Sequence, residues 1–230
     1  MLFDLEWNTS SDTAFALSVL PILLRGMVVT LQATVVGFFI AVTLGLLLAA
    51  LKSSRIRTVA WPARLISEFL RDTPLLIQLF FLYYVLPDYG IVLPAFMTGA
   101  LALGLQYSAY TSEVYRAGLE AVPRGQLEAA RALDLTPAHT FRVVILPQAI
   151  ARIIPALGNY LVSIMKDVPL LSVVSVVEML GAARIIGDRT FNYLIPLSMV
   201  GGLYLIMTLL SASAVRSLEN RLPRHGFPLK

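Results

Sequence analysis

Two adjacent ionisable residues, Lys166 and Asp167, end an apolar stretch within NYLVSIMKDVPLL, residues 159–171. Ionisable side chains inside a membrane span are costly, and they usually line a cavity or pair with each other. The Asp167 carboxylate can bind an ammonium or amidinium group, and Lys166 can bind a carboxylate or pair with Asp167. Pro169 breaks the helix beside them and frees backbone groups that can contact a bound solute. The alternative is that both residues lie at the outer membrane interface as snorkelling or gate residues.

Further polar residues lie in apolar stretches and are candidates to line a solute pathway. They are Gln78, Gln106, Tyr110, Glu113, Asn159 and Ser163. On a helix, the spacing of four and then three residues places Gln106, Tyr110 and Glu113 on one face. The alternative for these residues is hydrogen bonding between helices, which polar side chains commonly provide in membranes.

Other kinds of chemistry find little support in the sequence. The chain has no cysteine, so disulfides, thiolate metal sites and cysteine nucleophiles are excluded. Its two histidines, His139 and His225, are far apart in sequence, which argues against a metal cluster or a catalytic triad. We therefore expect no catalytic residue, no metal site and no cofactor bound by this chain. A net charge of +4 without an interleaved basic and aromatic run does not indicate nucleic-acid binding.

The composition indicates an all-α integral membrane protein. Of the 230 residues 57% are hydrophobic and 14% are charged, and the mean hydropathy is +0.77. A soluble domain carries about 25% charged residues. Long uncharged stretches predict about five transmembrane helices, near residues 27–51, 62–86, 95–116, 148–165 and 190–215. We expect one transmembrane domain, residues 1–230, with its core at about 20–220.

The distribution of the 18 Lys and Arg residues predicts the orientation in the membrane. Five lie within residues 52–71, after the first span and in the first part of the second, five lie around residues 116–152, and four lie in the C-terminal tail. The remaining four are Arg25, Lys166, Arg184 and Arg189. The positive-inside rule then places the N-terminus outside and the C-terminus in the cytoplasm. Arg184, Asp188 and Arg189 fall on the outer side, as a solvated surface or as a docking site for a partner.

The segment PRGQLEAARALDLTPAHTFRVVILPQA, residues 123–149, is polar and helix-prone although the chain around it is apolar. Pro123 can begin a helix, and Glu128 can pair with Arg124 or Arg131. Thr136 and Pro137 form a capping hydroxyl followed by proline, which predicts a second helix that Pro147 ends. Two short amphipathic helices are marginal alone and need a surface to pack on. They either close the base of the bundle or dock a cytoplasmic partner.

The same segment carries a family resemblance. Glu128, Ala129 and Ala130, with Val144, Leu146 and Pro147 at the required spacing, resemble the EAA motif of permease subunits of ATP-binding-cassette (ABC) importers. Asp134 stands where the motif has glycine, and aspartate tolerates a left-handed turn better than most residues. RDTPLLIQLFFLYY (71–84), with Asp72 in place of a glycine, and GLQYSAYTSEVYRAGLEAVPRGQ (104–126) resemble the polar amino-acid uptake subfamily. The stretch KDVPLLSVVSVVEML is similar to permeases for ectoine and hydroxyectoine.

The resemblance implies the type I importer permease fold and a set of partners. It implies that residues 123–147, including Arg131, form a coupling helix seated in an ABC ATPase dimer that binds the ATP. It also implies a second permease subunit, identical or different, and a periplasmic or extracellular solute-binding protein. The chain has no G-x-x-x-x-G-K-[ST] loop of its own, so a separate ATPase is needed.

The leading hypothesis from the sequence is therefore a non-catalytic permease subunit in a bacterial inner membrane. It would import polar, zwitterionic amino acids or related compatible solutes such as ectoine. A self-contained secondary transporter or channel is the main alternative, and an intramembrane enzyme is a remote one. The helix pair at 123–147 separates them, since a self-contained carrier has no need of a docking segment.

Overall fold

The computed structural model describes Trp7 and residues 10–221, a range that is helical and contains no strand. The tail residues Arg224 and Lys230, which the orientation prediction counts, lie outside the described residues. The long helices are α1 (Asp12–Lys52), α4 (Ala95–Glu120), α7 (Leu146–Asp167) and α9 (Leu194–Arg221). The shorter elements are α2 (Arg57–Asp72), α3 (Leu75–Phe80), η1 (Phe81–Val85), η2 (Leu86–Tyr89), α5 (Arg124–Ala132), α6 (Pro137–Thr140), η3 (Phe141–Ile145), η4 (Val168–Val174) and α8 (Met179–Thr190).

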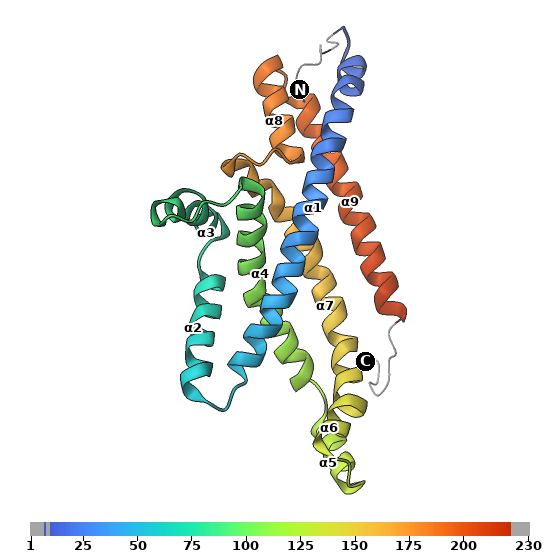
Figure 1. Ribbon diagram of the computed structural model, residues 1–230. Coiled ribbons are helices and arrows are strands. Elements are labelled where there is room, and N and C mark those ends of the chain that lie inside the picture. The colour runs from blue at the N-terminus through green and yellow to red at the C-terminus, as the bar shows by residue number, and fades with distance from the viewer. Residues whose placement is uncertain (1–6, 8–9, 222–230) are drawn as a thin grey trace.

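The long helices form a bundle whose two ends differ (Figure 1). Helices α5 and α6 protrude from one end, and α8 lies at the opposite end beside the beginning of α1. Helix α4 packs along α1 and also contacts α7 and α2, so it lies inside the bundle. We refer to the two ends as the α5–α6 end and the α8 end.

Among the described residues, three helical stretches are long and apolar enough to cross a bilayer unaided, and α4 is not one of them: Asp12–Lys52, Pro137–Val174 and Leu194–Arg221. The pair α2 and α3–η2 meets the same test only when both parts are taken together. Helix α4 has 26 residues, which is about 39 Å of helix, and its charged residues gather near its C-terminal end. These five segments correspond to the five predicted spans.

The second span is bent, which corrects the prediction of one continuous helix over residues 62–86. Helices α2 and α3 meet at an angle of 103° across Thr73 and Pro74. Proline disfavours helical backbone in the residue before it, and Thr73 accordingly has extended φ and ψ of −89° and 130°. As a result, α3 projects sideways from the bundle in Figure 1.

The first and fourth spans are also longer than predicted. Helix α1 begins at Asp12, where the Ser11 side chain caps it, and continues past Arg25. The prediction that Pro147 ends a helix and bends the chain is wrong, because helix is continuous over Pro137–Val174. A π-helical turn, Phe141–Ile145, comes just before Pro147. This wider turn accommodates a residue that has no N–H to donate.

Small residues allow α1 to approach its neighbours closely, as the glycines of the first span predict. A Cβ on Gly37 would lie 3.1 Å from Leu103 Cβ on α4, and a Cβ on Gly45 would clash with Thr111. On the other side of α1, Gly26 lies against the backbone of Met179, where α8 begins. The interior of the bundle is therefore held by close backbone contact as well as by aliphatic packing.

We expect Gly26→Val to unfold or misassemble the bundle. A Cβ at this position would lie 2.7 Å from Met179 Cα and 2.9 Å from Met179 N, and backbone atoms cannot rotate away. The cost should reach about 3 kcal/mol or more. A large fall in the thermal unfolding midpoint of the purified chain would show it. Gly201→Val is the matched control, since a Cβ there meets nothing within 4 Å, and an equal fall in both variants would contradict the argument.

Candidate functional site

The segment that resembles the EAA motif protrudes from the bundle as α5 and α6 (Figure 1). Glu128, Ala129 and Arg131 are exposed on α5, whereas Ala130 is buried. Glu128 forms neither of the ion pairs predicted with Arg124 or Arg131, and its carboxylate has no partner among the residues that the structure describes. Leu133, at the end of α5, keeps 74% of its surface exposed.

The turn after α5 has the left-handed conformation that a glycine would adopt readily. Asp134 has a φ of 53°, and its N–H donates to the Arg131 carbonyl at 3.0 Å. The next N–H, of Leu135, donates to the Ala130 carbonyl, also at 3.0 Å. These two hydrogen bonds, together with a left-handed residue after the helix, match the Schellman motif at a helix C-terminus. Aspartate therefore preserves the turn at the position where the motif has glycine.

The second part of the segment follows the predicted cap. The Thr136 hydroxyl accepts a hydrogen bond from the His139 N–H at 3.4 Å, and Pro137 is the first residue of α6. Leu146 is half-buried and Pro147 is exposed, both at the beginning of α7. The motif thus spans from a protruding helix to the base of a membrane span.

Substitutions at Asp134 test the turn. We expect Asp134→Gly to preserve it, because glycine adopts positive φ without strain. Asp134→Val should destabilise it by about 1–2 kcal/mol, because a β-branched residue is strained there. Amide hydrogen exchange of α5 in the purified chain measures this, with faster exchange expected in the valine variant only. Equal protection in both variants would show that the turn does not constrain α5.

A cluster of three tyrosines and one aspartate lies between α4 and α7, and we call it the tyrosine–aspartate cluster. The Tyr107 hydroxyl donates to Asp167 Oδ2 at 2.7 Å. The Tyr107 ring centroid lies 5.8 Å from that of Tyr110 and 5.9 Å from that of Tyr160. Tyr110 and Tyr160 are stacked at 5.8 Å, with 25° between their planes. A carboxylate beside aromatic faces is suited to bind a cationic group.

Lys166 and Asp167, adjacent in sequence, have different surroundings. Lys166 is exposed and lines a cavity of about 430 Å³ with Pro169 and Tyr204. Asp167 faces Tyr107 on α4. The side chains of Lys166 and Asp167 form no ion pair with each other. Helix α7 ends at Asp167 and a 3-10 segment begins at Val168, which is the break that Pro169 predicts. Only Asp167 of the two therefore belongs to the tyrosine–aspartate cluster.

Gln78 and Gln106 contact each other, and Gln78 also borders a hollow beside α2 and α3. Their side-chain amides are 2.5 Å apart, and Gln78 Nε2 also donates to the Leu70 carbonyl at 2.7 Å. Both residues are 7% exposed, so this contact joins α2, α3 and α4 inside the bundle. It has the geometry of the alternative stated above, hydrogen bonding between helices. Asn159 is exposed on α7, and its carbonyl accepts from the Ser163 hydroxyl at 3.1 Å.

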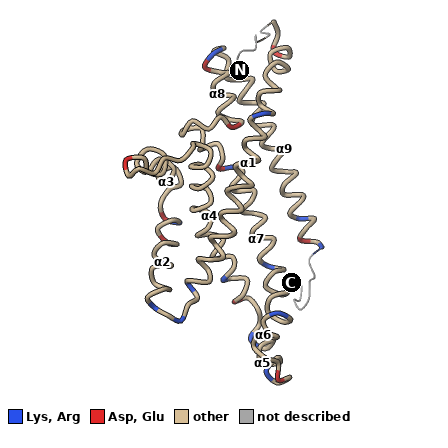
Figure 2. The backbone as a smooth tube through the Cα atoms, in the orientation of Figure 1, with Lys and Arg blue, Asp and Glu red and all other residues tan. Residues whose placement is uncertain are grey.

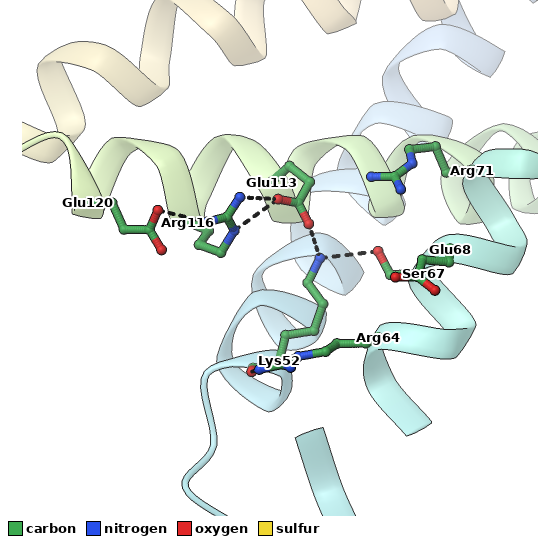
Figure 3. A pocket seen from close by; sticks show the side chains of 8 residues that line it. All are labelled: Lys52, Arg64, Ser67, Glu68, Arg71, Glu113, Arg116 and Glu120. Atoms are coloured by element: carbon green, nitrogen blue, oxygen red, sulfur yellow. Dashed lines mark hydrogen bonds and ion pairs between the residues drawn. The ribbon is translucent and has the colours of Figure 1, made fainter. Parts of the chain in front are cut away.

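Glu113 lies nearer the α5–α6 end, in an ion-pair network with Lys52 and Arg116 (Figure 3). Lys52 Nζ is 2.5 Å from Glu113 Oε1, and Arg116 is 2.8 Å from Glu113 Oε2. Lys52 Nζ also donates to the hydroxyls of Ser67 and Ser112, at 3.1 and 2.8 Å. The network borders a cavity of about 390 Å³, the α2–α4 cavity, lined by Lys52, Arg64, Ser67, Glu68, Arg71, Glu113, Arg116 and Glu120.

The tyrosine–aspartate cluster and the α2–α4 cavity are adjacent on α4. Tyr110 lies one turn from Glu113, and its hydroxyl donates to the Arg71 carbonyl at 3.4 Å. The sequence had singled out Tyr110, Glu113 and Asp167, but not Tyr107, Tyr160 or Lys52. Tyr107 is three residues from Tyr110, so helical spacing carried a signal for it. Tyr160 and Lys52 come from other helices, and their part depends on tertiary packing.

The α8 end carries a second polar cluster. Glu178 is fully buried and caps α8, accepting from the N–H groups of Leu180 and Gly181 at 2.9 and 2.6 Å. Burial raises the pKa of Glu178, and these two hydrogen bonds oppose the rise. Near the surface, the hydrogen bond from Tyr193 to Asp188, at 2.6 Å, raises the pKa of Tyr193.

Among the described residues, no group of three or more acidic or histidine side chains could hold a metal ion.

Comparison with known proteins identifies the family. Residues 41–224 match the family described as the inner membrane component of binding-protein-dependent transport systems. A probable amino-acid ABC transporter permease of Sinorhizobium fredii is 64% identical over 231 residues, covering 100% of both chains. A putative glutamine transport system permease of Rickettsia conorii is 35% identical, covering 87% of this chain and 92% of its own.

A solved structure shows the same architecture. A crystal structure of an amino acid ABC transporter with histidines superposes with a TM-score of 0.84 at 39% identity, covering 88% of this chain and 94% of that one. The chain thus belongs to the binding-protein-dependent transport family and is a permease subunit of an ABC importer, not its catalytic subunit.

Proposed function

We propose that this permease imports polar amino acids, driven by a separate ABC ATPase dimer that docks on α5 and α6. The observation that carries the proposal is the protruding α5–α6 segment, with an unpaired Glu128 and a left-handed turn at Asp134. ATP is expected to bind to the partner only. Closure of the ATPase dimer would move α5 and α6 and, through the continuous helix from Pro137, the position of α7.

The charge distribution supports the orientation proposed for the importer. Lys and Arg residues gather at the ends of the helices nearest α5 and α6, whereas fewer lie near the α8 end (Figure 2). By the positive-inside rule, the α5–α6 end faces the cytoplasm and the N-terminus faces outward. The α8 end, with Arg184 and Asp188, would then face the solute-binding protein that delivers the substrate.

The substrate class follows from the tyrosine–aspartate cluster and from the relatives. The relatives include an amino acid ABC transporter whose crystal structure was determined with histidines and a putative glutamine transport system permease. In this chain the Asp167 carboxylate would bind the substrate's ammonium group, and the faces of Tyr110 and Tyr160 would cover it. The narrower assignment to ectoine or hydroxyectoine remains a prediction from sequence.

A second permease subunit, identical or different, would complete the pathway. Exposed apolar side chains on α2, α3 and η1, including Phe69, Ile77 and Phe81, surround a hollow of about 300 Å³. Such a surface needs lipid or a protein partner to cover it. The same exposure along α9 is suited to contact with lipid.

Reconstitution tests the proposed function. The chain, its ATPase and its solute-binding protein are placed in proteoliposomes, and uptake of radiolabelled L-glutamine, L-histidine and ectoine is measured. We expect uptake of an amino acid to require ATP, the ATPase and the binding protein. Uptake by the purified chain alone on an ion gradient would instead show a secondary transporter, and uptake of ectoine alone would correct the substrate class.

A further inference from the structure

The α2–α4 cavity has charged groups that the protein itself leaves without a strong partner. Its α4 side is internally paired, with Glu113 held by Lys52 and with Arg116 between Glu113 and Glu120. The two positive and two negative charges therefore balance on that side of the cavity. The wall formed by α2 differs.

On α2, three charged side chains face the cavity at a spacing of four and three residues: Arg64, Glu68 and Arg71. Glu68 has no hydrogen-bond or ion-pair partner in the part of the chain that the structure describes. Among the described residues, the one polar partner of the Arg71 side chain is the carboxylate of its exposed neighbour Asp72, at 3.6 Å, and that of Arg64 is the Lys52 carbonyl, at 3.4 Å. The α2 wall therefore offers guanidinium donors and one carboxylate side by side.

This arrangement is complementary to a free α-amino acid. Side chains three or four residues apart on a helix have their Cβ atoms about 5–6 Å apart. The carboxylate and the ammonium of an α-amino acid are attached to one carbon, so neighbouring side chains can bind both. A guanidinium group binds a carboxylate through two parallel hydrogen bonds, and a glutamate accepts from an ammonium group. A cavity of about 390 Å³ is large enough for a small amino acid.

We infer that the α2–α4 cavity is a second binding site for an α-amino acid, in which Arg71 holds the carboxylate and Glu68 the ammonium group. The hydrogen bond from Tyr110 to the Arg71 backbone joins this cavity to the tyrosine–aspartate cluster. The cavity lies on the α5–α6 side of that cluster, so it serves as a station between the cluster and the cytoplasm. This role rests on the proposed function and on its orientation, whereas the binding itself does not.

The absence of cysteine from the sequence permits a probe at the site. Glu120→Cys places a single thiol at the cavity, where the native side chain is 62% exposed. The full chain is reconstituted in phosphatidylcholine nanodiscs, and the rate of maleimide labelling is measured with and without L-glutamine. We expect L-glutamine to slow labelling by about tenfold at a concentration about ten times its Kd. N-acetyl-L-glutamine and 4-aminobutanamide, which lack the ammonium and the carboxylate respectively, should not slow it.

Variants separate this site from the tyrosine–aspartate cluster. Glu68→Gln and Arg71→Gln should each abolish protection of the thiol, whereas Arg57→Gln, on α2 but outside the cavity lining, should not. Protection should persist in Asp167→Asn, which alters only the cluster. Its loss there would overturn the second site, because protection would then be an indirect effect of binding at the cluster.

Two further results would overturn the inference. One is labelling that L-glutamine does not slow at millimolar concentration. The other is labelling that phosphatidylethanolamine in the nanodisc slows without any amino acid, since its headgroup also carries an anion and an ammonium group. Uptake measured in proteoliposomes is independent of this labelling, so failure of the cavity site and failure of the proposed function are distinguishable.

Discussion

Glu128→Arg is expected to abolish coupled uptake by the assembled importer. The Glu128 carboxylate is exposed on the protruding helix α5 and has no partner within the described chain, so in the proposed complex it faces the ATPase. Inverting a charge at a protein interface typically costs 2–5 kcal/mol, because it replaces an attraction with a repulsion. At 1.4 kcal/mol for each factor of ten, uptake should fall by about 100-fold.

Two measurements distinguish how the loss arises. Co-purification of the ATPase with the permease reports docking, and substrate-stimulated ATP hydrolysis in proteoliposomes reports coupling. Glu219→Arg is the matched control, since it makes the same change on an exposed residue of α9. Normal uptake together with normal co-purification in Glu128→Arg would refute a docking role for α5. A loss in Glu219→Arg as well would point to a general effect of added positive charge.

The docking segment is the part of the molecule that sequence predicted in most detail. Its signals are local: proline at a helix start, a hydroxyl cap at Thr136 and a residue at Asp134 that tolerates positive φ. Such signals act within a few residues, so a sequence reports them well. The Glu128 ion pairs failed as predictions because i,i+4 pairing on an exposed helix is worth only a few tenths of a kcal/mol.

The predictions for the bundle that were wrong share one cause. The effect of a charged residue or a proline there depends on its tertiary surroundings, which the sequence does not show. Lys52 was counted as a loop charge, yet it is buried and holds α1, α2 and α4 together. Pro74 was treated as part of a span although it bends the chain by 103°, while Pro147 was expected to break a helix that continues through a π turn. Helix α8 was missed because its charged residues interrupt the apolar pattern.

In the candidate binding site, too, local sequence signals identified some residues, and tertiary packing determines the contacts of the others. Asp167 is predicted because it is an ionisable residue at the end of an apolar stretch. Helical spacing places Tyr110 and Glu113 on one face. The pairing of Asp167 with Tyr107, and the stacking of Tyr110 on Tyr160, require α4 and α7 to be packed together. The position of Glu113 in a different network, with Lys52, follows from where α1 ends. One face of α4 thus borders both the tyrosine–aspartate cluster and the α2–α4 cavity.

Asp167→Asn is expected to weaken the apparent affinity for the transported amino acid. The substitution keeps the size of the side chain and removes the negative charge that would attract an ammonium group. A hydrogen bond to a charged partner contributes about 1.5–3 kcal/mol. The KM of ATP-driven uptake should therefore rise by about 10- to 100-fold. The maximal rate should change less, since ATPase docking on α5 is unaffected.

The neighbouring residues supply the controls for Asp167. Lys166→Gln removes the adjacent charge, but Lys166 faces the α9 side, so the KM should stay near its original value. Tyr107→Phe keeps the ring and removes the hydroxyl that donates to Asp167 at 2.7 Å. We expect it to raise the KM less than Asp167→Asn does, because the carboxylate remains. If Asp167→Asn leaves the KM unchanged and lowers only the maximal rate, Asp167 belongs to a gate at the end of α7. A rise in KM with an unchanged rate identifies Asp167 as a residue that contacts the substrate.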